Sequence, residues 1–156
     1  MQLFDCTLRD GGNVLGNGFP ADLTVMMIDG LIRNGIRFIE YGNASGMGAY
    51  EGDGKSAPLT DAEYLDLAAP FLGKAELGMF VGVKHATEPN VALAAEKGLD
   101  FLRIGANAGD GEKAREGIGL VKKHGLTACF SLMKAYVLPP DALADEARRL
   151  EDMGLD

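Results

Sequence analysis

An arginine and an aspartate stand side by side near the start of the chain, directly before two glycines. Arg9 and Asp10 follow the expected first strand and precede Gly11 and Gly12. A guanidinium is a planar, permanently charged donor that binds anionic oxygens, and a carboxylate is a hard oxygen ligand for divalent cations. Glycines let the backbone bend with no side chain in the way. The pair could therefore hold an anionic oxygen and a divalent metal ion at one point.

A further carboxylate lies inside an otherwise apolar segment. Glu40 is the charged member of the sequence Phe-Ile-Glu-Tyr-Gly that spans Phe38–Gly42. Burying a carboxylate costs several kcal/mol unless it is paired, and Arg9 is the expected partner. The pair could also be no more than a satisfied polar bridge inside the fold. Asp10 could likewise be a turn residue, because aspartate before Gly-Gly is common in turns.

Other polar side chains fall where the expected strands end. Lys84 and Lys134 could in principle form Schiff bases, although most lysines at strand ends are solvated. His85 is isolated in the sequence, so a loop role is favoured. His124 precedes a helix-ending glycine, where a cationic side chain favours the helix dipole and capping. The remaining members of this set are Asn107 and Ser131.

One unit recurs along the chain: an apolar strand, a loop, an amphipathic helix and a glycine that ends the helix. This alternation predicts a parallel sheet with right-handed crossovers, and the glycines predict left-handed helix caps. The expected strands are Leu3–Cys6, Phe38–Tyr41, Leu77–Val83, Phe101–Ile104 and Thr127–Met133. The expected helices are Leu23–Asn34, Asp61–Phe71, Pro89–Lys97, Gly111–Lys123 and Pro140–Met153.

Two α/β architectures fit five such units. One is a TIM (βα)8 barrel of which the N-terminal five units are present, and the other is a five-stranded doubly wound open parallel sheet. A whole barrel takes about 250 residues, and the chain has 156. The final residues Met153–Asp156 form the kind of helix-to-strand turn that elsewhere in the chain leads into a strand. We therefore favour the barrel, with residues 1–156 as a single domain.

The composition of the chain indicates which classes of partner and which cellular location to expect. A net charge of -8 and a pI near 4.7 argue against nucleic-acid and anionic-membrane partners, which require a basic surface. No apolar stretch approaches the roughly 20 residues of a membrane span, and no signal-peptide pattern is present, so we expect a cytoplasmic protein. Cys6 and Cys129 lie in apolar segments and are interpreted as small hydrophobic residues rather than as a disulfide or a nucleophile.

The first-strand motif carries a family resemblance. The segment Thr7–Gly11 reads Thr-Leu-Arg-Asp-Gly, and Glu40 follows thirty residues after Asp10. This pattern resembles the metal-dependent lyase and aldolase superfamily that includes hydroxymethylglutaryl-CoA lyase and the isopropylmalate and homocitrate synthases. Within it, the chain is most similar to the 4-hydroxy-2-oxovalerate aldolases. That similarity extends over Leu102–Ile104, Leu132–Met133 and Leu138–Ala144.

The resemblance implies a carbon–carbon lyase that makes or breaks a bond next to a 2-oxo acid through a pyruvate-type enolate. By this resemblance Asp10 binds Mn²⁺, Mg²⁺ or Co²⁺, Arg9 stabilises the enolate, and Glu40 orients Arg9 or forms a hydrogen bond within the site. Arg9, Asp10 and Asn13 would contact the substrate. Asn13 stands where the family has a catalytic histidine, and an amide cannot act as a general base. Ala135 replaces the family's substrate-binding serine. The family's His-x-His metal pair belongs on the seventh strand, beyond the five units of this chain.

Two other functions remain open at this point. One is a Schiff-base aldolase that uses Lys134 or Lys84. The other is a non-catalytic barrel fragment that acts in assembly, because the first and fifth strands of an incomplete barrel leave unpaired edges. The expected partners are a small 2-oxo acid and either further copies of the chain or the remainder of a longer chain. We expect the 156-residue piece to be inactive by itself.

Overall fold

The computed structural model describes residues 3–52, 54 and 56–156. Within these residues, one parallel sheet has the strand order β1-β2-β3-β4-β5, so each strand lies beside its neighbour in sequence. A doubly wound sheet would reverse its strand order at a switch point, so the open-sheet alternative is wrong. The strands are β1 (Phe4–Asp5), β2 (Phe38–Glu40), β3 (Glu76–Gly82), β4 (Phe101–Asn107) and β5 (Thr127–Met133).

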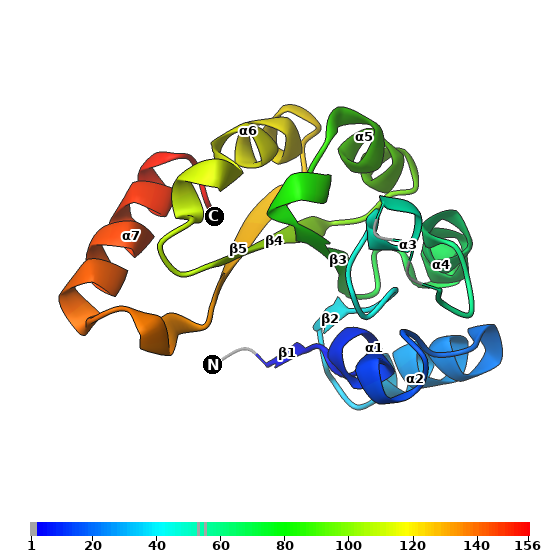
Figure 1. Cartoon of the computed structure of the whole chain (residues 1–156). Coiled ribbons are helices and arrows are strands. Elements are labelled where there is room, and N and C mark those ends of the chain that lie inside the picture. The colour runs from blue at the N-terminus through cyan, green and yellow to red at the C-terminus, as the bar shows by residue number, and fades with distance from the viewer. Residues whose placement is uncertain (1–2, 53, 55) are drawn as a thin grey trace.

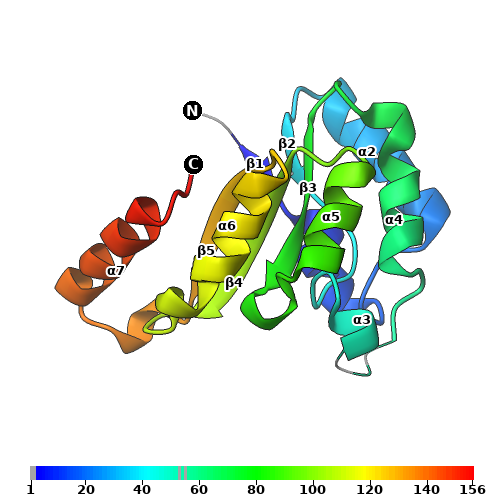
Figure 2. The same cartoon turned by 90° about the horizontal axis from the view of Figure 1, so that it is seen from above.

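Helices alternate with these strands and cover the convex side of the curved sheet (Figure 1). Seen after a 90° turn, α4, α5 and α6 run beside one another along the sheet (Figure 2). The chain is a curled half-barrel that matches the N-terminal part of a TIM barrel, which confirms the predicted fold class. The helices are α1 (Thr7–Asp10), α2 (Ala21–Arg33), α3 (Ala49–Gly52), α4 (Asp61–Ala68), α5 (Glu88–Glu96), α6 (Arg115–Lys123) and α7 (Pro140–Asp152).

The predicted helix caps are present. Gly35, Gly98 and Gly125 have φ angles of 86°, 82° and 77°, in the left-handed region that glycine adopts without strain. After Gly35, the amide of Ile36 donates to the carbonyl of Leu31 at 3.0 Å, and the helix ends at Gly98 and Gly125 repeat this arrangement. Each such cap directs the chain back towards the following strand.

The hydrophobic core lies between the sheet and the helices. Side chains alternate along each strand, so every second residue points into this layer and the others point to the concave side. Ile39, Leu77 and Leu102 are fully buried in the core, against Ile28 and Val91 from the helices. Glu40, next to Ile39, is consequently directed to the opposite side of the sheet. No helix of the described residues is long and apolar enough to cross a membrane.

The segment that carries Arg9 and Asp10 is helical, which the sequence pattern did not predict. The two residues follow the first strand as expected, but that strand stops at Asp5 and both residues lie in the helical turn α1. The Asp5 carboxylate accepts a hydrogen bond from the Thr7 amide at 3.0 Å, and the amides of Arg9 and Asp10 both donate to the Cys6 carbonyl. The backbone therefore coils directly after the strand and carries both side chains back over its end.

Two glycine-rich loops also contain regular structure. Gly11–Val14 form a 3-10 turn. A Cβ atom at Gly12 would approach the Cα of Gly18 to 2.9 Å, so this glycine is needed for close backbone contact. The stretch Gly42–Gly54 contains α3 and a backbone bridge from Met47 to β3. β4 also extends three residues beyond the predicted end, because Gly105–Asn107 continue in register with β5.

Candidate active site

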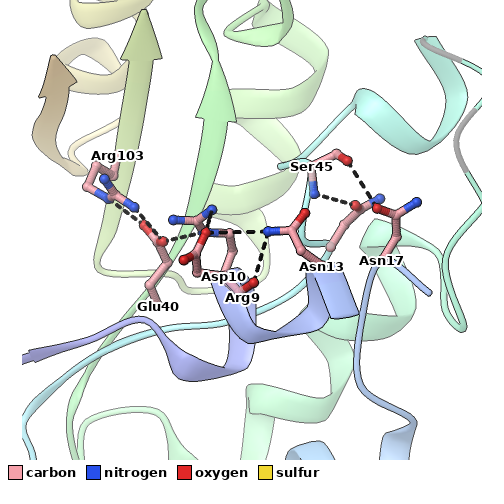
Figure 3. Close-up of polar contacts among 8 residues, drawn as sticks. Arg9, Asp10, Asn13, Asn17, Glu40, Ser45 and Arg103 are labelled. Atoms are coloured by element: carbon pink, nitrogen blue, oxygen red, sulfur yellow. Dashed lines mark hydrogen bonds and ion pairs between the residues drawn. The ribbon is translucent and has the colours of Figure 1, made fainter. Parts of the chain in front are cut away.

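A buried carboxylate is bound by two arginines at the end of β2 (Figure 3). The Glu40 side chain has no exposed surface. Its Oε1 accepts a hydrogen bond from Arg9 Nε at 2.7 Å, so the contact expected from the sequence is present. Arg103 on β4 donates from Nε to Oε2 at 2.6 Å and from Nη2 to Oε1 at 2.7 Å. Glu40 thus links two guanidinium groups that come from α1 and β4.

Arg9 also contacts Asp10, its neighbour in sequence. Arg9 Nη1 donates to Asp10 Oδ1 at 2.8 Å. The Arg9 side chain is 13% exposed and that of Asp10 is 62% exposed. Arg9 therefore connects a carboxylate that is sealed inside the fold with one that faces outward. Such an arrangement leaves Asp10 accessible to a ligand while Arg9 stays anchored from below.

Asn13 lies on the same turn and supports Asp10. Its Nδ2 donates to the Asp10 carbonyl at 2.9 Å and lies 3.4 Å from Asp10 Oδ1. The following loop is joined to the loop after β2: Asn17 accepts hydrogen bonds from the Ala44 amide at 2.9 Å and from the Ser45 hydroxyl at 3.3 Å. These contacts hold the two loops together beside Arg9 and Asp10 (Figure 3).

The described residues include one candidate metal ligand. Asp10 offers an exposed carboxylate whose Oδ2 takes part in no hydrogen bond within the described ranges, which suits a hard divalent cation. In residues 3–52, 54 and 56–156, no three or more histidine, cysteine, aspartate or glutamate side chains are grouped so that they could hold a metal ion. Any further protein ligands would have to come from outside the described part.

The other predicted site residues lie where the sequence placed them, at or near the carboxyl ends of strands. Lys84 and His85 follow β3 in a 3-10 turn, and Lys134 follows β5 with an exposed side chain and a φ of 54°. Hydrogen bonds join Arg9, Asp10, Asn13 and Glu40 into one group, and no side-chain hydrogen bond within the described ranges links Lys134, Asn107 or Ser131 to it. The structure therefore brings together one predicted group and leaves the Schiff-base candidate Lys134 outside its hydrogen bonds.

His124 lies at a helix end and contacts the neighbouring helix. It forms the C-terminal cap of α6, as predicted. Its Nε2 lies 2.8 Å from Glu88 Oε1 at the start of α5, where Lys123 also contacts Glu88 at 3.1 Å. The hydrogen bonds from His124 and Lys123, in that order, lower the pKa of the Glu88 carboxyl group. These contacts join the ends of two neighbouring helices.

Arg103 is the residue that sequence reasoning missed. It was noted only as part of the family resemblance, without a role. The signal was available, because Arg103 is the single charged residue within Phe101–Ile104, just as Glu40 is within its own strand. Two opposite charges, each inside an apolar strand, favour a direct pair in the fold.

Both cysteines are half-buried and free. They line a cavity of about 310 Å³ together with Phe4, Arg103 and Phe130. Burial raises the pKa of both thiols. A thiol with a raised pKa is mostly protonated at neutral pH and is a weak nucleophile. Cys6 and Cys129 therefore fit the predicted role of small hydrophobic residues.

Comparison with known proteins supports the aldolase resemblance. No family model matches the chain. It is 31% identical over 156 residues to 4-hydroxy-2-oxovalerate aldolase 2 of Nocardia farcinica, covering the whole chain and 45% of that protein. It is 26% identical over 156 residues to the 4-hydroxy-2-oxovalerate aldolase of Moorella thermoacetica, covering the whole chain and 46% of that protein. The chain thus spans about half the length of the curated relatives it matches.

A solved structure shares the fold. The carboxyl transferase domain of Rhizobium etli pyruvate carboxylase, determined with pyruvate and biocytin, superposes with a TM-score of 0.75 at 15% identity. The match covers 99% of this chain and 29% of that one. The predicted resemblance to the aldolase-type barrels is therefore confirmed over the full length of the chain, at the level of fold and of sequence similarity.

Proposed function

We propose that this chain, similar over its full length to the 4-hydroxy-2-oxovalerate aldolases, is the N-terminal part of a divalent-metal-dependent aldolase barrel. The reaction makes or breaks the carbon–carbon bond next to a 2-oxo acid and passes through a pyruvate-type enolate. We further propose that residues 1–156 act as a single domain and that the remaining units belong to a longer chain. The similarity to aldolases along all 156 residues supports this proposal.

The observation that carries the proposal is the setting of Arg9. Its guanidinium is held by the buried Glu40 at Nε and by the exposed Asp10 at Nη1, on the barrel face where such folds bind substrates. Arg9 Nη2 forms no hydrogen bond with any described residue, so its two N–H groups are available to an incoming oxygen. A fixed cationic donor aimed at a developing oxyanion stabilises the transition state more than the substrate.

Asp10 is the residue of this chain that would hold the divalent metal ion. Its exposed carboxylate and the neighbouring Arg9 place a metal ligand and an anion-binding group on one helical turn. When bound, Mn²⁺, Mg²⁺ or Co²⁺ would act as a Lewis acid that polarises the 2-oxo group. Asp10 by itself does not complete a metal site, so we assign the other ligands to the remainder of the full-length protein and to water.

Asn13 would bind substrate rather than move a proton. Its Nδ2 donates a hydrogen bond to the Asp10 carbonyl, whereas its Oδ1 accepts no hydrogen bond from a described residue. A neutral amide has no titratable proton near pH 7, so the general base must be another group. We assign to Glu40 the role of orienting Arg9, because the Glu40 side chain is fully buried and cannot contact a substrate directly.

The proposal also covers the substrate class, the oligomeric state and the location of the full-length protein. The substrate class is a small 2-oxo acid, and the full-length protein would be a homo-oligomer in the cytoplasm. The acidic composition, with a net charge of -8, does not favour binding to nucleic acids or anionic membranes.

Metal binding to the full-length protein tests the proposal. We expect Asp10→Ala to weaken Mn²⁺ binding about tenfold or more, because a carboxylate ligand is lost. Asp29→Ala is a matched control, since Asp29 pairs with Arg33 at 2.8 Å on the outer surface of α2. Isothermal titration calorimetry would measure both affinities. Unchanged Mn²⁺ affinity in Asp10→Ala would remove Asp10 from the metal site.

A trapping experiment separates the metal mechanism from the Schiff-base alternative. The full-length protein is incubated with pyruvate and sodium borohydride, which reduces an imine to a stable adduct. We expect the intact mass of the protein to remain unchanged. A covalent adduct on Lys84 or Lys134 would instead establish the Schiff-base mechanism.

A further inference from the structure

Arg103 makes two short hydrogen bonds to Glu40 but has no part in the chemistry assigned so far. It lies within β4, and its side chain is 16% exposed. We propose that Arg103 is a positioning residue that sets the orientation of Arg9 by acting through Glu40. This inference rests on the function proposed above and adds a residue to its site.

The hydrogen bonds of Glu40 explain why Arg103 is needed. Arg9 provides one bond, from Nε to Oε1, whereas Arg103 serves both carboxylate oxygens. Without Arg103, Oε2 would have no partner among the described residues, although the carboxylate is fully buried. A buried acceptor that lacks a partner is costly, so Arg9 would be drawn to bond both oxygens itself. Arg103 therefore leaves Arg9 with a single bond to Glu40.

The aromatic ring of Phe80 lies next to both guanidinium groups. The Cζ atom of Arg9 lies 4.9 Å from the centre of the Phe80 ring, and that of Arg103 lies 5.2 Å from it. Phe80 fits there because Gly105 on β4 has no side chain: a Cβ at Gly105 would come within 2.2 Å of the ring. Planar cations stack favourably on an aromatic face, so the ring restricts the tilt of both groups.

As a result, two of the three nitrogens of the Arg9 guanidinium already donate hydrogen bonds. Arg9 is held at Nε by Glu40, at Nη1 by Asp10 and over its plane by Phe80. Within the described part of the chain, Nη2 keeps both of its N–H groups for a substrate oxygen. If Arg103 is lost, Arg9 rotates towards Glu40 and Nη2 moves away from the developing oxyanion. Such a displacement affects the transition state more than substrate binding.

Kinetics of the full-length protein test this step. In Arg103→Lys, which keeps the charge but loses the two-pronged contact, we expect kcat to fall about 10- to 100-fold with little change in KM. Arg115→Lys is the matched control, because Arg115 also makes two hydrogen bonds to one glutamate, Glu112, on the exposed surface of the protein. We expect Arg115→Lys to retain the kcat of the natural sequence. Arg103→Gln provides a second variant if the lysine variant does not fold.

A measurement without turnover separates this inference from the proposed function. The Nε–H signal of Arg9, assigned by its loss in Arg9→Lys, is followed by ¹H–¹⁵N NMR in the full-length protein without metal or substrate. We expect the signal to shift or broaden in Arg103→Lys and to stay unchanged in Arg115→Lys. If the natural protein has no aldolase activity, the proposed function fails and this signal alone decides the inference. An unchanged Arg9 signal in folded Arg103→Lys would overturn it.

Discussion

Glu40 carries one negative charge but accepts hydrogen bonds from two guanidinium groups. Because the side chain is fully buried, water cannot compensate for the loss of any of these bonds. Burying a charged network is costly unless each member is paired, and a network that is partly broken is worse than none. At the scale of single residues, Glu40 is therefore the position where stability and the orientation of Arg9 depend on the same atoms.

Replacing the carboxylate by an amide tests this dependence. We expect Glu40→Gln to lower the free energy of unfolding by about 3–5 kcal/mol, because the new NH₂ group would face a guanidinium donor and both arginines would lose their buried counter-charge, while Arg9 keeps only the exposed Asp10. Urea denaturation of the full-length protein measures the change. Glu112→Gln is the control, since Glu112 is 64% exposed and pairs with Arg115. A similarly small effect in both variants would show that the buried cluster does not stabilise the fold.

At the scale of elements, two glycines shape the concave side of the sheet. Gly78 on β3 pairs in register with Glu40 and with Phe101, so these residues lie on the same side. A Cβ at Gly78 would come within 2.4 Å of the Phe101 ring, and one at Gly105 within 2.2 Å of the Phe80 ring. The glycines therefore leave room for two aromatic rings beside the charged cluster.

A single added methyl group tests the packing of β3 on β4. We expect Gly105→Ala to lower the free energy of unfolding by about 1–3 kcal/mol, because Phe80 must leave its place beside both guanidinium groups. In Gly119→Ala, on the exposed face of α6, the new methyl group meets nothing within 4 Å. That control should raise stability by about 0.5–1 kcal/mol through backbone entropy. Chemical denaturation of both full-length variants measures the difference, and a stable Gly105→Ala would contradict the packing argument.

The contact between α5 and α6 has a predictable dependence on pH. The hydrogen bonds from His124 and Lys123 lower the pKa of Glu88, so the folded state favours the ionised carboxylate. A lowered carboxyl pKa stabilises the protein above the ordinary glutamate pKa of about 4.3, and this contribution is lost as pH falls through the folded-state value.

Glu88→Gln removes this contribution. We expect the Tm of the full-length variant to lie below that of the natural sequence near pH 6, because the ion pair with Lys123 and the charge-assisted contact with His124 are lost. The two Tm values should converge as pH falls through the lowered pKa of Glu88, where the carboxylate becomes protonated. Differential scanning calorimetry across this range is the measurement. A Tm difference that does not change with pH would show that ionisation of Glu88 is not involved.

At the scale of the whole molecule, the half-barrel is open at both edges of its sheet. β1 and β5 each have one neighbouring strand, so their outer backbone groups are unpaired within the sheet. A closed barrel has no such edges. Phe4 on β1 and Met133 at the end of β5 also expose large apolar side chains. Exposed strand edges with apolar side chains favour association with further strands.

The unpaired strand edges predict how the isolated chain associates and whether it is active. We expect the 156-residue chain by itself to show no aldolase turnover and to self-associate or to remain partly unfolded, because its strand edges are unpaired and the described residues supply only one ligand of the proposed metal site. Size-exclusion chromatography with light scattering and a pyruvate-release assay measure both properties. Turnover by an isolated monomer would contradict this expectation and would require a complete active site within these residues.

The sequence by itself determined the order of strands and helices, the glycine caps and the need of Glu40 for a cationic partner. These features depend on local physics: the spacing of apolar residues, the left-handed conformation of glycine and the cost of an unpaired charge inside an apolar strand. The same reasoning identified Arg9 as the partner, and the structure shows that contact.

Only the tertiary structure decided how this site is built. Arg103 and Glu40 are 63 residues apart in the chain, and they meet because β2 and β4, which lie on either side of β3, both direct these side chains to the concave side. The helical turn that carries Arg9 and Asp10 likewise depends on the contacts of Asp5 and Cys6 rather than on apolar spacing. Register and sheet curvature arise from packing between distant segments, and no local pattern in the sequence encodes these distances.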